Sequence, residues 1–473
     1  MKQLPTLLTK SLSLSVCSLP AAASTTTLQQ IALHQPKGVA KVVLKKGKTQ
    51  LFKDGNPMVY SGAVDRIIGR PPPKTGDVVL VADGTEKPIG WGMYNSVSMF
   101  CVRLMQLEDE ATSDSSCALN MEKLIETRID AAVEMRRRLG LPSVHTNAYR
   151  LINSEGDRKE GKMIREAKIK GRESYGRWQG VIGLSGLIID VFGGVAVVAS
   201  SAAWVEKYKS EIEACIKKIN YINHCGWVGA YYLLQLGWNY TRRNVKFTDL
   251  LILGHVVPIC QIVENEIVYT ISLKGQKTGF YADQRENRQF ISRISDGQKV
   301  LDICCYSGGF ALNAVRGGAL NVTGIDTSPL ALELAKENVV LNNIDPGRIS
   351  FLREDATEFM KGALLRNESW DIVIIDPPKL APTKKVLHSA SGMYRNLNSL
   401  AMQLTKRGGL LMTCSCSGAV TQSGIFMRIL QGAASMAGRR ITVLRQAGAA
   451  CDHPIDPSYP EGAYLTNILL RVS

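Results

Sequence analysis

Five apolar runs toward the C-terminus constrain the fold more than any other feature of the chain. From Lys299 onward they read VLDICCY, NVTGID, ISFLRED, DIVIIDPP and GGLLMTCSCS, with helix-like segments between them. Such runs match buried strands, and strands that alternate with helices form a mostly parallel sheet with helices on both faces. The sequence therefore predicts a doubly wound, Rossmann-like α/β domain whose ligands bind at the carboxyl ends of the strands.

The first predicted strand runs directly into a glycine turn, where a ligand can approach the backbone closely and a helix start offers free amide groups. The candidate cofactor-binding residues in this segment are Asp302, Tyr306, Gly308, Gly309 and Phe310. An alternative role for Asp302 is to cap the end of the strand. The turn has neither a GxGxxG motif nor a P-loop lysine, which disfavours a dinucleotide or a phosphate ligand.

The next two strands end in carboxylates that suit an adenosyl group. The second strand ends at Asp326, which is followed by Thr327. Asp326 lies roughly twenty residues beyond the turn, the spacing at which an acidic residue accepts hydrogen bonds from ribose hydroxyls. The third strand ends near Asp355 and Ala356, where a carboxylate or a backbone group can contact an adenine edge. These residues favour S-adenosylmethionine as the cofactor.

The fourth strand ends in a segment that suits a planar substrate. It reads Asp376-Pro377-Pro378-Lys379, and the two prolines make a stiff turn that presents its carbonyl groups and a carboxylate. In enzymes that methylate an exocyclic amine, an aromatic residue normally follows the two prolines and stacks on the base. Lys379 stands at that place, which disfavours amine methylation and leaves the turn as a candidate substrate-binding segment.

The fifth strand ends in TCSCSG, which supplies a candidate nucleophile. C5 of a pyrimidine accepts a methyl group only after a thiolate has added to C6. Cys416 is the predicted nucleophile, Asp376 can hydrogen-bond the ring and stabilise the adduct, and Cys414 is predicted to be a buried structural thiol. Cytosine is favoured over uracil, and the base must be single-stranded or flipped out to reach the thiol.

Bulk composition indicates a soluble protein with a polyanionic partner. The net charge of +15 favours nucleic acid, because each phosphate contact releases counterions, and a solvated basic surface is the alternative. No apolar stretch approaches the ~18 residues of a membrane span. The eleven cysteines are scattered, with no CxxC pair and no histidine at metal-ligand spacing, so reduced thiols and no metal are expected.

The N-terminus resembles a targeting segment. The first 53 residues contain no Asp or Glu, and residues 1–36 are rich in Ser, Thr, Leu and Ala, as in an organellar transit peptide. No arginine occurs before Arg66, which favours a chloroplast over a mitochondrion. A disordered tail or a secretory signal is the alternative.

Two further domains are expected ahead of the α/β domain. Short β-like runs with Gly and Pro between them predict a small barrel over residues 38–108. Residues 112–265 look α/β, with an amphipathic helix over Met121–Arg138 and a second helical stretch over residues 205–218. Within this domain, residues 159–183 are basic and lack hydrophobic periodicity, which indicates a solvated insertion or, alternatively, a direct RNA contact.

Several motifs together resemble a known family. The motifs that carry the resemblance include the glycine turn, DPPKL and TCSCSG. Two longer ones are GQKTGFYADQRENR over residues 275–288 and DHPIDPSYPEGAYL near the C-terminus. They are similar to motifs of the bacterial large-subunit ribosomal RNA cytosine-C5 methyltransferases that carry an N-terminal PUA domain. The resemblance covers residues 40–158, 184–210 and 262–473.

The resemblance implies a PUA RNA-binding module, a central α/β domain and a class I methyltransferase domain over residues 266–473, in a plant organellar member of the family. It implies that Cys416 is the nucleophile and that the segment around Gln284 and Arg285 packs over the methionine end of the cofactor. The partner it implies is RNA, most directly large-subunit ribosomal RNA. Whether the chain forms a homodimer is left open.

Three departures from the family keep other functions open. Residues 159–183 look inserted, and residues 222–258 do not resemble the family linker. Lys379 stands where other RNA cytosine-C5 methyltransferases carry a second cysteine, so the base that takes the C5 proton is unassigned. The alternatives are RNA base-nitrogen methylation on the same scaffold and a non-catalytic RNA-binding or ribosome-assembly protein.

Overall fold

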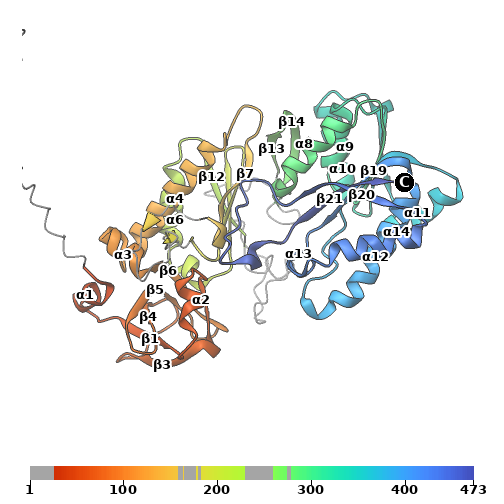
Figure 1. Cartoon of the computed structure of the whole chain (residues 1–473). Helices are drawn as coiled ribbons and strands as arrows, with labels where there is room; N and C mark the ends of the chain where they lie inside the picture. Colours follow the sequence, from red (N-terminus) through yellow and green to blue (C-terminus); the bar gives the residue numbers. More distant parts are fainter. Residues whose placement is uncertain (1–25, 158–162, 165–176, 179–182, 229–258, 274–278) are drawn as a thin grey trace, which may run out of the picture.

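The computed structural model divides into three parts along the sequence (Figure 1): a small β-domain, a central α/β domain and a larger C-terminal α/β domain. It describes residues 26–157, 163–164, 177–178, 183–228, 259–273 and 279–473. Most of the predicted insertion at 159–183 and residues 229–258 of the predicted linker lie outside these ranges. Of the insertion, the pieces β8 (Met163–Ile164) and β9 (Arg177–Trp178) pair antiparallel.

The N-terminal β-domain is one curved sheet of six strands in the order β2-β6-β5-β4-β1-β3. Its strands are β1 (Ala40–Leu44), β2 (Met58–Tyr60), β3 (Val64–Ile68), β4 (Val78–Ala82), β5 (Pro88–Tyr94) and β6 (Phe100–Leu107). Phe52 of helix α2 (Thr49–Lys53) is fully buried in its apolar core, beside Val59 and Leu104. The structure therefore has a six-stranded β-domain in the region for which the sequence predicted a small barrel over residues 38–108.

Helix α1 (Leu28–Leu33) precedes this sheet and belongs to the folded body. Thr27 and Gln30 form a capping box, in which each side chain accepts a hydrogen bond from the other residue's backbone amide. Leu28 is fully buried, and its amide donates to Glu108 at 3.1 Å. The expectation of a disordered tail up to residue 36 is thus corrected, because helix α1 and the buried Leu28 belong to the folded body. Helix α1 reads LQQIAL and contains no Ser or Thr, so a composition averaged over residues 1–36 did not separate the helix from the segment before it.

The central domain packs helices against a four-stranded sheet in the order β12-β11-β10-β7. Its strands are β7 (Ala148–Asn153), β10 (Leu187–Phe192), β11 (Val195–Ser200) and β12 (His224–Val228). Helix α4 (Met121–Arg138) confirms the predicted amphipathic helix, with the Asn120 side chain as its cap. The second predicted helix is divided at Tyr208 into α5 (Ala203–Lys207) and α6 (Lys209–Lys217).

A β-hairpin joins the central domain to the C-terminal domain. Strands β13 (Ile259–Glu264) and β14 (Ile267–Ser272) pair antiparallel around a turn at residues 265–266. The amide of Val263 donates to Asn147 of the central domain at 2.7 Å, and the amide of Thr270 donates to Asn338 of the C-terminal domain at 2.7 Å. The boundary predicted at 265/266 therefore falls inside a hairpin that both domains share.

The C-terminal domain is a doubly wound sheet in the order β17-β16-β15-β18-β19-β21-β20, as predicted. Its strands are β15 (Lys299–Ile303), β16 (Asn321–Asp326), β17 (Ile349–Arg353), β18 (Trp370–Ile375), β19 (Thr405–Ser415), β20 (Ile441–Ala447) and β21 (Thr466–Val472). The first five pair parallel, and β21 runs antiparallel between β19 and β20. The chain order reverses between β15 and β18, which places a ligand crevice at the carboxyl ends of these strands.

Helices cover both faces of this sheet (Figure 1). They are α8 (Arg285–Ile294), α9 (Gly309–Arg316), α10 (Pro329–Leu341), α11 (Ala356–Leu365), α12 (Leu387–Leu404), α13 (Gly418–Ser423) and α14 (Phe426–Ala437). Two separate apolar clusters, one on each side of the sheet, hold the helices in place. Among the helices of the described residues, none is long and apolar enough to cross a membrane.

Candidate active site

A cleft of about 1490 Å³ lies at the carboxyl ends of the parallel strands and is bordered by all three domains. Most of the residues that the sequence singled out line it together. These are Gln284, Tyr306, Gly309, Phe310, Asp326, Thr327, Asp355, Ala356, Asp376, Pro377, Pro378, Lys379 and Cys416. Asp302, Gly308 and Arg285 are the three predicted site residues that do not line the cleft.

The glycine turn after β15 is held in an unusual backbone conformation. Cys304, Tyr306 and Gly308 all have positive φ, at 63°, 51° and 79°. A β-carbon on Gly308 would lie 3.0 Å from the Phe351 ring, and one on Gly309 would lie 2.9 Å from the Arg288 side chain. The turn is therefore packed from behind, and its backbone can meet a ligand only on the cleft side.

Asp302 lies within β15 and is fully buried beneath this turn. Its Oδ2 accepts a hydrogen bond from the Ala311 amide at 3.0 Å, and its Oδ1 has no hydrogen-bond partner among the described residues. Burial raises the pKa of Asp302 to about 8, and the charges of Asp376 and Asp326 act in the same direction. A buried carboxyl with one unsatisfied oxygen fits a cationic group, and S-adenosylmethionine carries an ammonium group.

The two carboxylates predicted to meet the adenosyl group are both fixed by backbone amides. Asp326 accepts from Tyr306 at 2.9 Å with Oδ2 and from Ser328 at 2.9 Å with Oδ1. Asp355 caps α11 by accepting from Thr357 at 2.8 Å. An ionised carboxylate has further lone pairs, so both groups can still accept hydrogen bonds from a ligand in the cleft.

Asp376 is held by a chain of buried side chains. Gln284 donates from Nε2 to Asp376 Oδ2 at 3.0 Å. Asn287 donates to Gln284 Oε1 at 2.7 Å, and Arg445 donates to Asn287 Oδ1 at 2.7 Å. Gln284 was predicted to contact the cofactor; the structure places it in the cleft wall, bonded to the carboxylate. Sequence reasoning missed Asn287, which lies in the first turn of α8, three residues after its N-cap residue Gln284.

The two cysteines of the fifth strand occupy different environments. Cys416 directly follows β19, is half-buried, and its Sγ lies 3.9 Å from the carbonyl oxygen of Pro377. Cys414 is fully buried; its Sγ accepts from Asn467 at 3.2 Å. Burial raises the pKa of Cys414 well above that of an ordinary thiol, so it remains protonated. Cys416 is the one of this pair that lines the cleft.

Two family matches cover most of the chain. Residues 173–443 match S-adenosylmethionine-dependent methyltransferases, and residues 42–107 match the PUA-like domain. The ribosomal RNA large subunit methyltransferase I of Erwinia tasmaniensis is 31% identical over 91% of this chain and 99% of that relative. The protein of the same name from Alteromonas mediterranea is 31% identical over 92% of this chain and 99% of its own length. The chain belongs to the S-adenosylmethionine-dependent methyltransferases.

Solved structures share the fold of this methyltransferase. A SAM-dependent methyltransferase from Streptococcus mutans has a TM-score of 0.68 at 18% identity, and the match covers 91% of this chain and 99% of that one. A second structure, of a methyltransferase complexed with SAH, also has a TM-score of 0.68, at 17% identity. The predictions of a methyltransferase with a PUA-like domain and of S-adenosylmethionine as its cofactor are confirmed.

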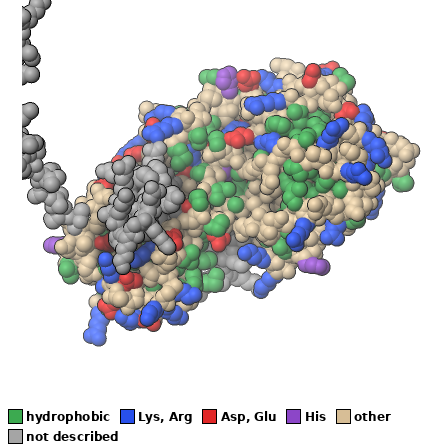
Figure 2. Space-filling view, viewed as in Figure 1, with side chains coloured by type: hydrophobic (Ala, Val, Ile, Leu, Met, Phe, Trp, Pro, Cys, Tyr) green, Lys and Arg blue, Asp and Glu red, His purple; other side chains and the backbone are tan. Residues whose placement is uncertain are grey.

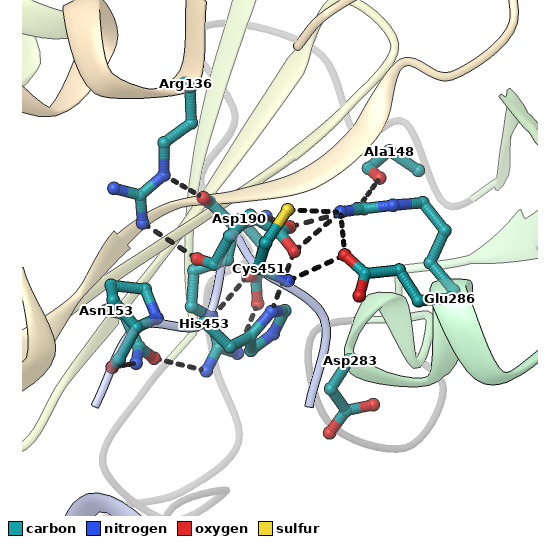
Figure 3. Close-up of polar contacts among 12 residues, drawn as sticks. Arg136, Ala148, Asn153, Asp190, Asp283, Glu286, Cys451 and His453 are labelled. Carbon is teal, nitrogen blue, oxygen red and sulfur yellow. Dashed lines mark hydrogen bonds and ion pairs between the residues drawn. The ribbon is translucent and has the colours of Figure 1, made fainter. Parts of the chain in front are cut away.

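Arg285 of the methyltransferase does not line the cleft and makes contacts in two domains. Figure 3 shows this network of polar contacts, with Ala148 of the central domain and Cys451 and His453 of the methyltransferase domain labelled. Its guanidinium donates to Asp452 at 2.8 and 3.1 Å and to the Ala148 carbonyl at 3.4 Å. Asp452 also accepts from the Arg150 amide at 2.8 Å, and its own carbonyl accepts from Arg136 at 2.8 Å. The structure therefore assigns Arg285 to the contact between the methyltransferase and central domains, rather than to the cofactor.

Tyr281, which the sequence did not single out, forms part of the cleft wall beside the predicted Tyr306. The rings of Tyr281 and Tyr306 meet edge to face, with centroids 5.3 Å apart. Burial raises the pKa of Tyr281, and the charges of Tyr306, Asp283, Cys416 and Asp376 add to the rise, so its hydroxyl stays protonated. Tyr281 lies in the GFYADQRENR motif, and an aromatic residue inside a motif that also carries Gln284 was the available signal.

We expect the binding of S-adenosylmethionine at pH 7 to release about one proton from Asp302. In the free protein its pKa of about 8 keeps the carboxyl protonated at this pH. A bound ammonium group favours the ionised form, so the pKa falls and the proton leaves. Calorimetry in two buffers of different ionisation enthalpy measures the release. Asp302→Asn is the control, and equal proton release in both proteins would contradict the assignment.

We also expect Asn287→Ala to lower kcat about tenfold while leaving the Kd of S-adenosylmethionine unchanged, because Gln284 then loses one hydrogen bond and no longer fixes Asp376. Methyl-transfer kinetics and calorimetry measure the two constants. The matched control is Asn342→Ala, which removes a similar amide that bonds the Val268 backbone at 2.6 and 2.8 Å, away from Asp376. Equal losses of kcat in both variants would mean that Asn287 serves stability alone.

Proposed function

We propose that this methyltransferase transfers a methyl group to C5 of a cytosine in large-subunit ribosomal RNA through a covalent adduct with Cys416. The observation that carries the proposal is the position of Cys416, which lines the same cleft as Asp376 and the residues for the cofactor. The RNA substrate is supported by the names of relatives that are 31% identical over nearly their whole length. The PUA-like domain is consistent with that substrate.

The chemistry assigns one bond-forming step to the protein. The Cys416 thiolate adds to C6, which forms an S–C6 bond and moves the C5–C6 double-bond electrons to C5. When bound, S-adenosylmethionine supplies the methyl group as an electrophile, and C5 accepts it. A base then removes the proton from C5, the double bond forms again, and Cys416 leaves C6 as a thiolate.

Asp376 stabilises the adduct in this proposal. Its carboxyl group can hydrogen-bond the ring N3 and the exocyclic amino group, and Gln284 fixes its orientation at 3.0 Å. The turn at Pro377 and Pro378 supplies the neighbouring wall, and Sγ of Cys416 lies against the Pro377 carbonyl. The base and the thiol are therefore expected to meet at the junction of β18 and β19. A duplex hides C6 within the base stack, so the target must be unpaired or flipped out.

The covalent step predicts a trapped complex. We expect the full chain, incubated with S-adenosylmethionine and large-subunit RNA containing 5-azacytidine, to give a protein–RNA adduct on a denaturing gel. Cys416→Ala should abolish the adduct and reduce methyl transfer by on the order of a thousandfold or more, because the nucleophile is lost. The matched control, Cys414→Ala, should still form the adduct and transfer methyl groups, since Cys414 is fully buried and does not line the cleft.

The other outcomes point to the alternatives. Transfer of labelled methyl groups to the RNA without formation of an adduct would indicate that a base nitrogen, rather than cytosine C5, is methylated. No label and no adduct with the wild-type chain, although it binds S-adenosylmethionine, would favour a non-catalytic RNA-binding protein.

We further propose that the protein acts in the chloroplast, with the mitochondrion as the alternative. The support is compositional: there is no Asp or Glu before Asp54 and no Arg before Arg66. We take residues 1–27 as the leader in this proposal, because Leu28 is buried in the folded body. Residues 1–27 fused to a fluorescent protein should enter chloroplasts of plant cells, and fluorescence in mitochondria or the cytosol would overturn the proposal.

A further inference from the structure

The turn between β5 and β6 of the PUA-like domain borders the catalytic cleft. Residues 95–100, which we call the hairpin tip, read NSVSMF and carry no charge. Val97 and Met99 are 80% and 67% exposed, yet both line the cleft that also contains Cys416. Phe100 is half-buried and lines the cleft beside them. Two large apolar side chains are thus presented to solvent at the entrance of the reacting site.

Hydrogen bonds hold the hairpin tip in one shape. The Asn95 amide donates to the Cys101 carbonyl at 2.8 Å, and the Val97 amide donates to Asn95 Oδ1 at 3.0 Å. The Ser96 amide donates to Thr75 Oγ1 at 3.0 Å. A turn with satisfied backbone groups keeps its apolar side chains exposed, because they cannot fold back without breaking these bonds.

Contacts with both other domains fix the hairpin tip relative to the cleft. Arg103, in the strand that leaves the tip, donates to Ser185 Oγ at 2.8 Å and to the Ser201 carbonyl at 3.1 Å in the central domain. On the methyltransferase side, the Tyr459 hydroxyl donates to the sulfur of Met58 in β2 at 3.3 Å. The tip therefore occupies a set position above the site, rather than being carried on an independent domain.

We propose that the hairpin tip packs against the nucleotide next to the base that enters the cleft, with Val97 and Met99 as the contacting side chains. This inference rests on the proposed function, because it requires an RNA substrate. An uncharged tip cannot pair with phosphates, but apolar side chains and a thioether pack well on the faces of bases.

The geometry of base extrusion favours RNA as the occupant. A base that reaches Cys416 must enter the cleft that the tip borders, and its departure leaves its neighbour without a stacking partner. Proteins that unstack nucleic acids compensate by inserting apolar side chains such as Met, Leu or Phe. The tip presents such side chains on the wall of the same cleft, where this proposal places the neighbouring nucleotide.

Charge substitutions at the hairpin tip test this contact. Val97→Asp and Met99→Asp should each lower kcat/KM for protein-free large-subunit RNA about tenfold or more, because a stacking contact is lost and a carboxylate faces the RNA. The Kd of S-adenosylmethionine and the melting temperature should not change. The matched controls are Val144→Asp and Met436→Asp, whose side chains are 85% and 56% exposed and do not line the cleft; they should keep wild-type kcat/KM.

A crosslink locates the contact directly. With a photoreactive benzoylphenylalanine in place of Val97, irradiation should link the protein to a nucleotide adjoining the methylated one, as mapped on the same RNA. A crosslink at a distant nucleotide, or wild-type kcat/KM in both tip variants, would overturn the proposal. A loss of activity on ribosomal particles but not on protein-free RNA would also overturn it, in favour of a ribosomal protein. The wild-type adduct assay reports separately on the proposed function, since it depends on Cys416 and not on the tip.

Discussion

One buried carboxylate, Asp452, joins the methyltransferase domain to the central domain. Arg285 of α8 and the amide of Arg150 in β7 both donate to it. Although burial acts to raise it, His453 and Arg285 hold the pKa of Asp452 well below its usual range. A buried charge of this kind is stable only while its partners are present, so the contact fixes the geometry of both domains together.

Helix α8 carries both the Arg285 side chain that contacts Asp452 and the Asn287 side chain that orients Gln284 beside Asp376. In α8, Arg285 points to Asp452, while Asn287 meets Gln284, which bonds Asp376. The domain contact and the orientation of Asp376 therefore share one rigid element. This coupling explains why the GFYADQRENR motif is dense in polar residues: it carries two separate hydrogen-bond networks on two faces of one helix turn.

The sequence predicted the features that depend on residues close together along the chain. Apolar runs and the glycine turn identified β15 to β19 and the residues at their ends, because strand order in a doubly wound sheet brings those ends together. It could not predict contacts between distant segments, such as Arg285 with Asp452 or Val97 with the cleft. Gln284 and Arg285 adjoin in sequence and were expected to act together, yet Gln284 caps α8 while Arg285 is its first residue, and their hydrogen-bond partners differ. The hydrophobic pattern of the sequence identifies helices and strands. The role of a polar side chain depends instead on which helix or strand packs beside it.

The distribution of charge explains how a basic protein can select a neutral base. Acidic side chains, among them Asp326, Asp355 and Asp376, outnumber the basic side chains in the cleft lining, although the chain has a net charge of +15. Figure 2 shows Lys and Arg side chains spread over the outer face of the molecule. Phosphates are attracted to that surface and repelled by the carboxylates inside, so the RNA backbone stays outside while an uncharged base can enter. Under the proposed function, extrusion of one base, rather than recognition of a duplex, is the step that brings a nucleotide to Cys416.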